Sequence, residues 1–345
     1  MKLSFAVLLF LLSFVASAAG NHAPVAIAIH GGAGTILKEN MTPEMEADFT
    51  ATLSRAVKHG YSLLKEGKSG EEAVVSTIRI LETSPLFNAG VGAVYTYDGQ
   101  HELDASIMHG ATKNAGAVAG VKTVLSPIAL AQTVMNKSSH VMLAGAGAET
   151  FAREQGLALV DNSVFDTPHR LEALKKVKNR INKTSAYDNA QQGTERFGTV
   201  GAVVLDSKGN LVAGTSTGGM TAKRYGRIGD SPVIGAGTYA DNKSCAVSAT
   251  GHGEYFIRYH VAADICARVK YQKVSLEKAA NDVINSVLVK VKGEGGVIAL
   301  DSHGNITMPF NTAGMYRASI NTEGHMVVGI YKHWQLAHDW KKSEK

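Results

Sequence analysis

The sequence has little of several features that mark particular classes of protein. Its 345 residues include two cysteines and seven prolines, and the net charge is only +5. No basic stripe is interleaved with aromatic residues, so we expect no nucleic-acid partner. After residue 15, no stretch is apolar enough to span a bilayer. With 45% apolar and 19% charged residues, the composition is that of a folded globular protein.

The two cysteines, Cys245 and Cys266, leave the redox state open. In an oxidising compartment they could pair. A chain of this length, however, does not need a cross-link to bury a core. We therefore favour two buried free thiols over a disulfide.

The first residues have the order of a targeting signal. A positively charged start precedes an apolar run from Leu3 to Val15, and A-S-A follows at residues 16–18. This order is typical of a secretory signal peptide with an A-x-A cleavage site. We expect residues 1–18 to be removed and the mature protein to be periplasmic or secreted, with no membrane partner.

Hydrophobic periodicity and turn residues divide the rest of the chain into helices and strands. The helices expected are 43–66, 70–82, 127–136, 171–181, 254–270 and 274–291. The strands expected are 24–30, 93–97, 102–108, 141–143, 200–205, 211–215, 244–250, 297–300, 306–308 and 326–331. Because the two kinds come in blocks rather than in strict alternation, we expect an α+β protein with largely antiparallel sheets.

The dipeptide Gly198-Thr199 follows a polar segment without a core pattern, within an expected mobile linker at about 167–198. A Thr becomes a strong nucleophile if the bond before it is cut. The freed α-amine titrates near pH ~8 and can act as the base for its own hydroxyl. An arbitrary Gly-Thr merely starts a strand, but the motifs around this one favour the nucleophile.

Two other motifs are rejected on their context. Residues 214–218 match G-x-S-x-G, and His30–Gly34 resembles a lipase oxyanion loop, which together would make Ser216 a nucleophile. That elbow requires a strand, a turn and a helix, whereas loop-like residues follow Gly218. At residues 145–147, G-A-G lacks the third glycine of a dinucleotide loop, so we expect a turn there.

Several segments occur in a fixed order along the chain. They are H-G-G-A-G at 30–34, L-F-N-A-G-V-G at 86–92, H-E-L-D-A at 101–105, A-G-A-V-A-G at 115–120, G-T-V-G-A-V at 198–203, T-S-T-G-G-M at 215–220, G-R-I-G-D-S-P at 226–232 and A-T-G-H-G-E at 249–254. This series resembles the plant-type L-asparaginase and isoaspartyl peptidase family of N-terminal-nucleophile (Ntn) hydrolases. The resemblance spans nearly the whole mature chain.

The resemblance implies a fold and a maturation step. The fold is an αββα four-layer sandwich, in which two mainly antiparallel sheets lie between helical layers. A single Ntn-hydrolase domain would cut itself into an α subunit, 19–198, and a β subunit, 199–345. The two fragments would stay associated, and two such heterodimers would pair.

The resemblance also implies catalytic residues. Thr199 would be the nucleophile, exposed by cleavage after Gly198, whose missing Cβ tolerates a strained scissile bond. Thr217 would position the nucleophile and its amine. Thr250 and Gly251 would form the oxyanion pair, a hydroxyl and a backbone N–H aimed where negative charge develops.

The substrate contacts implied by the family lie in two places. Arg227 and Asp230 would bind the α-carboxylate and α-ammonium of an aspartyl unit, because a guanidinium fork suits a carboxylate and an Asp accepts from an ammonium. Gly251, Gly253 and Asn88 would complete the pocket. Catalysis would need no cofactor, and His252 receives no role. A structural sodium ion would be bound by the backbone carbonyls of Leu81, Glu82, Ser84, Phe87, Ala89 and Val91.

The activity implied is hydrolysis of small-molecule substrates, β-aspartyl dipeptides and L-asparagine, through an aspartyl-enzyme ester that releases L-aspartate. One alternative is glycosylasparaginase, which cleaves the GlcNAc–Asn bond with similar machinery. Those enzymes tend to carry a different residue where Gly218 stands, so the sequence favours the first activity. A second alternative is a secreted binding protein that kept the fold. It predicts a mutated nucleophile or anchor, and the sequence has neither.

Overall fold

The computed structural model describes residues 23–183, 198–332 and 335–339. The expected signal peptide, 1–18, lies outside the described residues, as does 184–197, which makes up much of the expected linker. Within the described part of the chain, no helix combines the length and the apolar character needed to cross a membrane.

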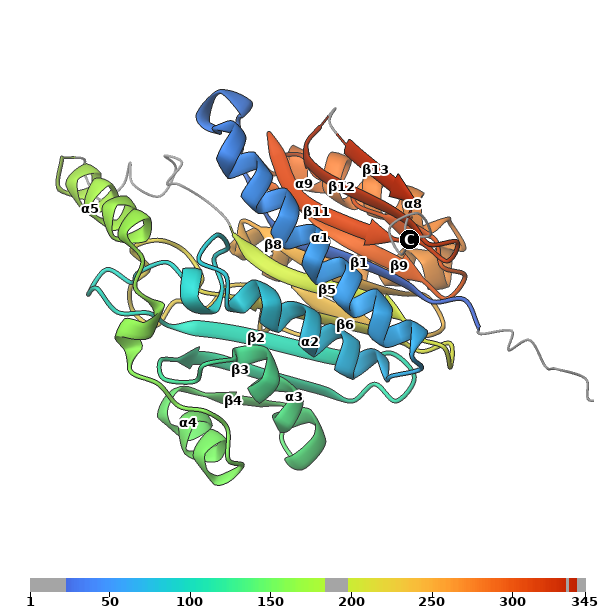
Figure 1. The fold of residues 1–345 in the computed structure, drawn as a ribbon, viewed down its shortest axis with the longest axis horizontal. Coiled ribbons are helices and arrows are strands. Elements are labelled where there is room, and N and C mark those ends of the chain that lie inside the picture. The colour runs from blue at the N-terminus through green and yellow to red at the C-terminus, as the bar shows by residue number, and fades with distance from the viewer. Residues whose placement is uncertain (1–22, 184–197, 333–334, 340–345) are drawn as a thin grey trace, which may run out of the picture.

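A large sheet forms the centre of the protein (Figure 1). Among the described residues it has nine strands in the order β13-β12-β11-β1-β5-β6-β2-β3-β4, and every neighbouring pair is antiparallel except β3 and β4. The strands are β1 (Ala26–Gly34), β2 (Leu103–His109), β3 (Ala115–Val121), β4 (Met142–Ala144), β5 (Thr199–Leu205), β6 (Leu211–Thr217), β11 (Gly314–Ile320), β12 (His325–Tyr331) and β13 (Gln335–Asp339).

A second, smaller sheet is antiparallel throughout, with the described strands in the order β10-β9-β8-β7. They are β7 (Thr238–Ala240), β8 (Cys245–Gly251), β9 (Gly295–Asp301) and β10 (Ile306–Thr307). This sheet lies against one face of the large sheet, and apolar side chains from both sheets form the layer between them. Helices therefore cover only the outer face of each sheet.

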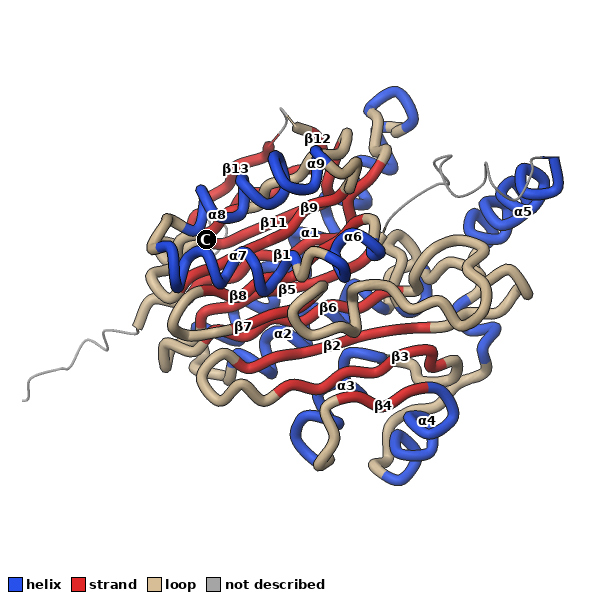
Figure 2. The backbone as a smooth tube through the Cα atoms, turned by 180° about the vertical axis from the view of Figure 1, so that it is seen from behind, coloured by secondary structure: helices blue, strands red, loops and turns tan. Residues whose placement is uncertain are grey.

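The outer face of the large sheet is covered by α1 (Pro43–Lys65), α2 (Gly70–Glu82) and α3 (Pro127–Lys137) (Figure 1). The small sheet is covered by α6 (Gly253–Arg258), α7 (Val261–Ala267), α8 (Leu276–Asp282) and α9 (Leu288–Lys290) (Figure 2). Helix α4 (Gly145–Glu154) packs against β3 and β4 at one edge of the large sheet, and α5 (Pro168–Lys183) projects away from the sheets (Figure 1). The hydroxyls of Thr42 and Ser69 accept backbone N–H bonds in the first turns of α1 and α2, which fixes where these helices begin.

Alternation along β5 shows how one strand serves two apolar layers. Val200 and Val204 lie on the face of β5 that α2 covers, whereas Val203 and Leu205 face the small sheet. A third layer, which includes Phe256, joins the small sheet to its helices. Because side chains alternate between the faces of a strand, each sheet buries both faces. The expected αββα sandwich is confirmed.

The element pattern differs from the sequence prediction at several places. Residues 93–97 are not a strand, and G-A-G at 145–147 begins α4 instead of forming a turn. The helix expected at 254–270 is broken at His260, which has a left-handed φ of 46°. Strands β3, β7, β11 and β13 were not predicted. In β3 the reason is composition, because alanine and glycine leave little hydrophobic alternation to detect.

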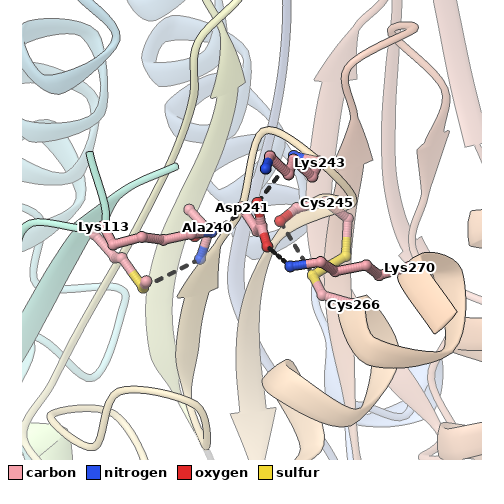
Figure 3. The surroundings of a disulfide bond; sticks show 8 residues. Lys113, Ala240, Asp241, Lys243, Cys245, Cys266 and Lys270 are labelled. Atoms are coloured by element: carbon pink, nitrogen blue, oxygen red, sulfur yellow. Dashed lines mark hydrogen bonds and ion pairs between the residues drawn. A yellow bond between two sulfur atoms is a disulfide. The ribbon is translucent and has the colours of Figure 1, made fainter. Parts of the chain in front are cut away.

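The expectation of two free thiols is wrong. Cys245 and Cys266 form a disulfide, and their Cα atoms are 5.3 Å apart (Figure 3). Cys245 begins β8, and Cys266 lies on α7, which packs across that strand. The pairing follows from this helix-on-strand packing rather than from any need of a long chain for a cross-link.

Candidate active site

Three neighbouring strands of the large sheet bring polar side chains to one end. Thr199 starts β5 opposite Thr217 at the end of β6, and Thr217 in turn pairs with Asp104 near the start of β2. The Thr199 hydroxyl donates to the Thr217 hydroxyl at 3.1 Å. The Thr217 oxygen also accepts the backbone N–H of Gly219 at 3.0 Å. A buried hydroxyl pair is therefore fixed at the predicted nucleophile.

The peptide bond before Thr199 lies in a very narrow space. A Cβ atom on Gly198 would stand 2.8 Å from Cβ of Asn88. On the other side, a Cβ on Gly32 would stand 2.6 Å from Cα of Gly198, and Gly32 has a φ of +112°. Residues without a Cβ are thus required at 32 and 198, since either side chain would displace the Gly198-Thr199 bond.

The predicted oxyanion residues lie at the end of β8, in the second sheet. Thr250 is fully buried, and its hydroxyl oxygen accepts the Ala33 N–H at 3.3 Å. Gly251 has a φ of +156° and lines a small pocket together with Thr199 and Thr217. Strands from both sheets therefore meet at Thr199.

The same pocket contains the two predicted substrate anchors, Arg227 and Asp230. Gly253 packs against both, because a Cβ there would lie 2.8 Å from Nη2 of Arg227 and 3.0 Å from Oδ1 of Asp230. Thr199, Arg227, Asp230 and Gly251 thus line one pocket, although they lie far apart in the sequence.

Asp230 is a buried carboxylate, only 5% exposed. Burial raises its pKa to about 7, against the opposing charge of Arg227. Its Oδ2 atom has no hydrogen-bond partner among the described residues. A buried acceptor in this state fits a cationic ligand, because an ammonium group would supply both the missing donor and the missing charge.

Arg227 already has a carboxylate partner in this structure. Its Nε and Nη2 atoms donate to the two oxygens of Glu254 at 2.9 and 3.0 Å. Burial would raise the pKa of Glu254, but the hydrogen bond and charge of Arg227 outweigh it and lower that pKa. Glu254 ends the A-T-G-H-G-E segment, and its contact with Arg227 was not predicted from the sequence. The bidentate pair has the geometry in which a guanidinium recognises a carboxylate.

The asparaginase family model matches residues 23–330. The chain belongs to the asparaginase family. The isoaspartyl peptidase of Salmonella typhimurium is 48% identical over 307 residues, which cover 89% of this chain and 98% of that protein. The isoaspartyl peptidase of Escherichia coli is 47% identical with similar coverage, and the isoaspartyl peptidase/L-asparaginase of Rattus norvegicus is 38% identical over 306 residues. The expectation of an enzyme of this family is confirmed.

In this asparaginase-family chain, Asn88 lies beside the pocket rather than in it. Its Nδ2 donates to the Gly219 carbonyl at 2.8 Å, and its Oδ1 accepts the Val94 N–H at 2.9 Å. Asn88 and Gly198 line a separate, larger cavity. Asn88 thus fixes the loop after Thr217, while a role in touching substrate stays a prediction.

His30 is a second residue to which sequence reasoning gave no role. It is fully buried, and burial lowers its pKa to about 3, against the effect of its bond to the Thr199 backbone. A carbonyl can only accept, so the 2.9 Å contact with the Thr199 oxygen places the ring hydrogen on Nδ1. Nε2 then accepts from the Ser248 hydroxyl at 2.9 Å. Neutral His30 holds the backbone of Thr199 in this asparaginase-family chain.

A buried ion pair supports the loop that follows Thr217. Nζ of Lys223 lies 3.9 Å from Oδ2 of Asp104 and donates to the Glu102 carbonyl at 3.0 Å. A Cβ on Gly219 would stand 3.0 Å from the same ammonium. Burial raises the pKa of Asp104, and the Lys223 charge opposes this rise. The H-E-L-D-A motif therefore contributes support beneath the pocket.

The expected sodium loop turns back on itself between α2 and the short helix at Gly90–Gly92. A Cβ on Gly90 would collide with the Glu82 carbonyl, and one on Gly92 with the Phe87 carbonyl. These carbonyls therefore point into a tight loop, and oxygen donors of this kind suit a hard alkali ion. A sodium ion at this place in the asparaginase-family chain stays a prediction.

Proposed function

We propose that the chain is an autoprocessed threonine hydrolase that cleaves β-aspartyl dipeptides and L-asparagine and releases L-aspartate. The observation that carries this proposal is one pocket in which the Thr199–Thr217 hydroxyl pair meets Arg227 and the buried Asp230 carboxylate. The names of the relatives, isoaspartyl peptidase and isoaspartyl peptidase/L-asparaginase, support the same reaction.

Maturation begins with attack of the Thr199 hydroxyl on the Gly198 carbonyl. The peptide bond becomes an ester, and water then hydrolyses it to leave a free Thr199 amine and a Gly198 carboxylate. The narrow space around Gly198 supports this step, since it leaves the scissile bond little freedom to move. The family resemblance supplies the assignment of the bond.

In the mature enzyme the same hydroxyl attacks the side-chain amide carbon of the substrate. The Thr199 amine takes the hydroxyl proton and returns it to the leaving nitrogen. The hydroxyl of Thr250 and the N–H of Gly251 hold the oxyanion, and losing one such donor typically costs ~10²–10³ in rate. Water then cleaves the aspartyl ester and releases L-aspartate.

Specificity follows from the two anchors. An aspartyl unit linked through its side chain keeps both α groups free, so its carboxylate can bind Arg227 and its ammonium can bind Asp230. An ordinary α-peptide bond consumes one of these groups. Glu254 takes the Nε and Nη2 edge of Arg227, so Nη1 and the second hydrogen of Nη2 would hold the substrate carboxylate.

The packing of Gly218 favours the asparaginase type over glycosylasparaginase. A Cβ at 218 would stand 2.5 Å from Oδ1 of Asn88 and 2.7 Å from Cβ of Ala93. A residue with a side chain would therefore push Asn88 away from the loop that it holds. Assays with β-Asp-Leu, L-asparagine and GlcNAc-Asn test the choice. We expect turnover of the first two, and turnover of GlcNAc-Asn alone would contradict the proposal.

The two fragments would remain together because they share one sheet. Strand β1 lies in the α fragment and is inserted between β11 and β5 of the β fragment, with main-chain pairing on both edges. We propose the same dimer of heterodimers that the resemblance implies. We also propose secretion after removal of residues 1–18, which the Cys245–Cys266 disulfide supports, because such bonds persist in oxidising compartments.

A further inference from the structure

A second cavity begins at Gly198, the residue before Thr199, and neither Arg227 nor Asp230 lines it. It has a volume of about 630 Å³ and begins at Gly198, Gly219 and Asn88. Gly219 also lines the small pocket of the anchors, so the two spaces share a wall beside Thr199. This volume lies within the range of small-molecule sites, roughly 300–1,000 Å³.

The chemistry of the proposed reaction sets the direction of the leaving group. The anchors hold the aspartyl unit in the small pocket, and the Thr199 amine must give its proton to the leaving nitrogen. That amine nitrogen is the atom bonded to Gly198 in the uncut chain. The leaving group therefore extends from Thr199 toward Gly198, where the large cavity begins.

One wall of this cavity is aromatic. Phe49 and Tyr316 stack with ring centroids 4.1 Å apart, and Phe87 meets Phe49 edge-on at 5.5 Å. Leu86 and Met45 extend the apolar surface. Such a wall favours an apolar or aromatic side chain, because apolar area leaves water when the ligand enters.

Another part of the lining is cationic. Arg170 lines the cavity and is held by its Nε, which donates to the Gly92 carbonyl at 2.9 Å. Burial raises the pKa of Tyr316, and the Arg170 charge opposes the rise, so this charge acts across the cavity. Burial and the charge of Arg170 both lower the pKa of the neighbouring His169. Asp48 supplies negative charge at an exposed position of the lining.

We propose that this cavity is the subsite for the leaving amino acid of β-aspartyl dipeptides, and that it selects an apolar side chain with a free α-carboxylate bound by Arg170. The proposal rests on the proposed function and deepens it by naming the class of the leaving residue. Aspartyl recognition and leaving-residue recognition are then separate, one through Arg227 and Asp230 and the other through Arg170 and the aromatic wall.

Three substrates separate these contributions in the matured enzyme. β-Asp-Phe carries both recognised groups, β-aspartyl-phenethylamide lacks the α-carboxylate, and β-Asp-Gly lacks the side chain. We expect wild type to favour β-Asp-Phe in kcat/KM over each of the others by about tenfold, as for loss of one charge-assisted hydrogen bond or of a comparable apolar contact.

The matched variants are Arg170→Gln, Arg170→Lys and Arg153→Gln, the last removing one charge from an exposed position on α4. Arg170→Gln should remove the advantage of β-Asp-Phe over the phenethylamide, whereas Arg170→Lys should keep most of it. Arg153→Gln should leave the selectivity ratio at its wild-type value. Intact mass confirms that each variant has matured before its kinetics are measured.

Two results would overturn the subsite. One is a wild-type enzyme that hydrolyses all three substrates with similar kcat/KM. The other is an Arg170→Gln variant that changes the rate of maturation, or lowers every activity equally, while the selectivity ratio stays that of wild type. Failure of the proposed function looks different, because wild type would then hydrolyse neither β-aspartyl dipeptides nor L-asparagine.

Discussion

Asp230→Asn should make the ligand-free enzyme more stable at neutral pH while lowering its activity. The Asp230 carboxyl is buried, and its pKa is raised from 3.8 to about 7. The folded state therefore binds more protons than the unfolded state between these two pH values. Stability contributed by the protonated carboxyl is present below pH 3.8 and is lost as the pH rises through 7.

The size of the effect follows from the width of that window. Between pH 5 and pH 7 the Asp230 carboxyl is protonated in the folded state and ionised in the unfolded state. The free energy of unfolding then falls by about 1.4 kcal/mol per pH unit, or about 3 kcal/mol over the two units. Asparagine does not titrate, so Asp230→Asn escapes this loss. The free energy of unfolding of the variant minus that of wild type should thus be about 3 kcal/mol larger at pH 8 than at pH 5.

Calorimetry of both proteins without ligand at pH 5 and pH 8 measures this difference. Asp282→Asn, at a more exposed position on α8, is the matched control for the loss of one carboxylate. In parallel, kcat/KM for β-Asp-Leu should fall by about 10- to 100-fold, because the substrate ammonium loses its charged acceptor. An equal stability change at both pH values would refute the reasoning about the buried carboxylate.

Three further predictions concern residues around the pocket. Arg227→Ala should mature normally yet lose substrate binding, and an unchanged kcat/KM for β-Asp-Leu would remove it from the site. Lys223→Met should destabilise the protein by about 3–5 kcal/mol in denaturant unfolding, because it leaves Asp104 as an uncompensated buried charge. Adding Asp104→Asn to that variant should restore part of the loss, and strictly additive losses would contradict the ion pair. Replacing Cys245 and Cys266 by Ser should cost about 3 kcal/mol through the freed 21-residue loop, and unfolding identical to wild type would rule this out.

Much of the fold could be predicted from local patterns. Residues 70–82 have helical periodicity and a Ser at the N-cap, and α2 has the same bounds. The expected strands 200–205 and 211–215 likewise correspond to β5 and β6, which pair antiparallel. The broken helix at His260 was missed because the left-handed φ of a single residue leaves no mark in the hydrophobic period.

The site shows the same division. Thr199, Thr217, Arg227 and Asp230 were predicted from motifs and lie in one pocket. Residues that act through partners far along the sequence were not recognised. The His30 contact with Thr199 spans 169 residues, and only the tertiary fold determines which buried groups meet.

The most direct test of the central claim is the intact mass of purified, denatured wild-type protein. We predict two fragments of roughly 19 and 16 kDa, the heavier beginning after the signal peptide and the lighter at Thr199. A Thr199→Ala variant should remain a single chain. A wild-type protein that stays uncut over days, yet hydrolyses β-Asp-Leu, would contradict the account, because Thr199 would then be only the first residue of β5.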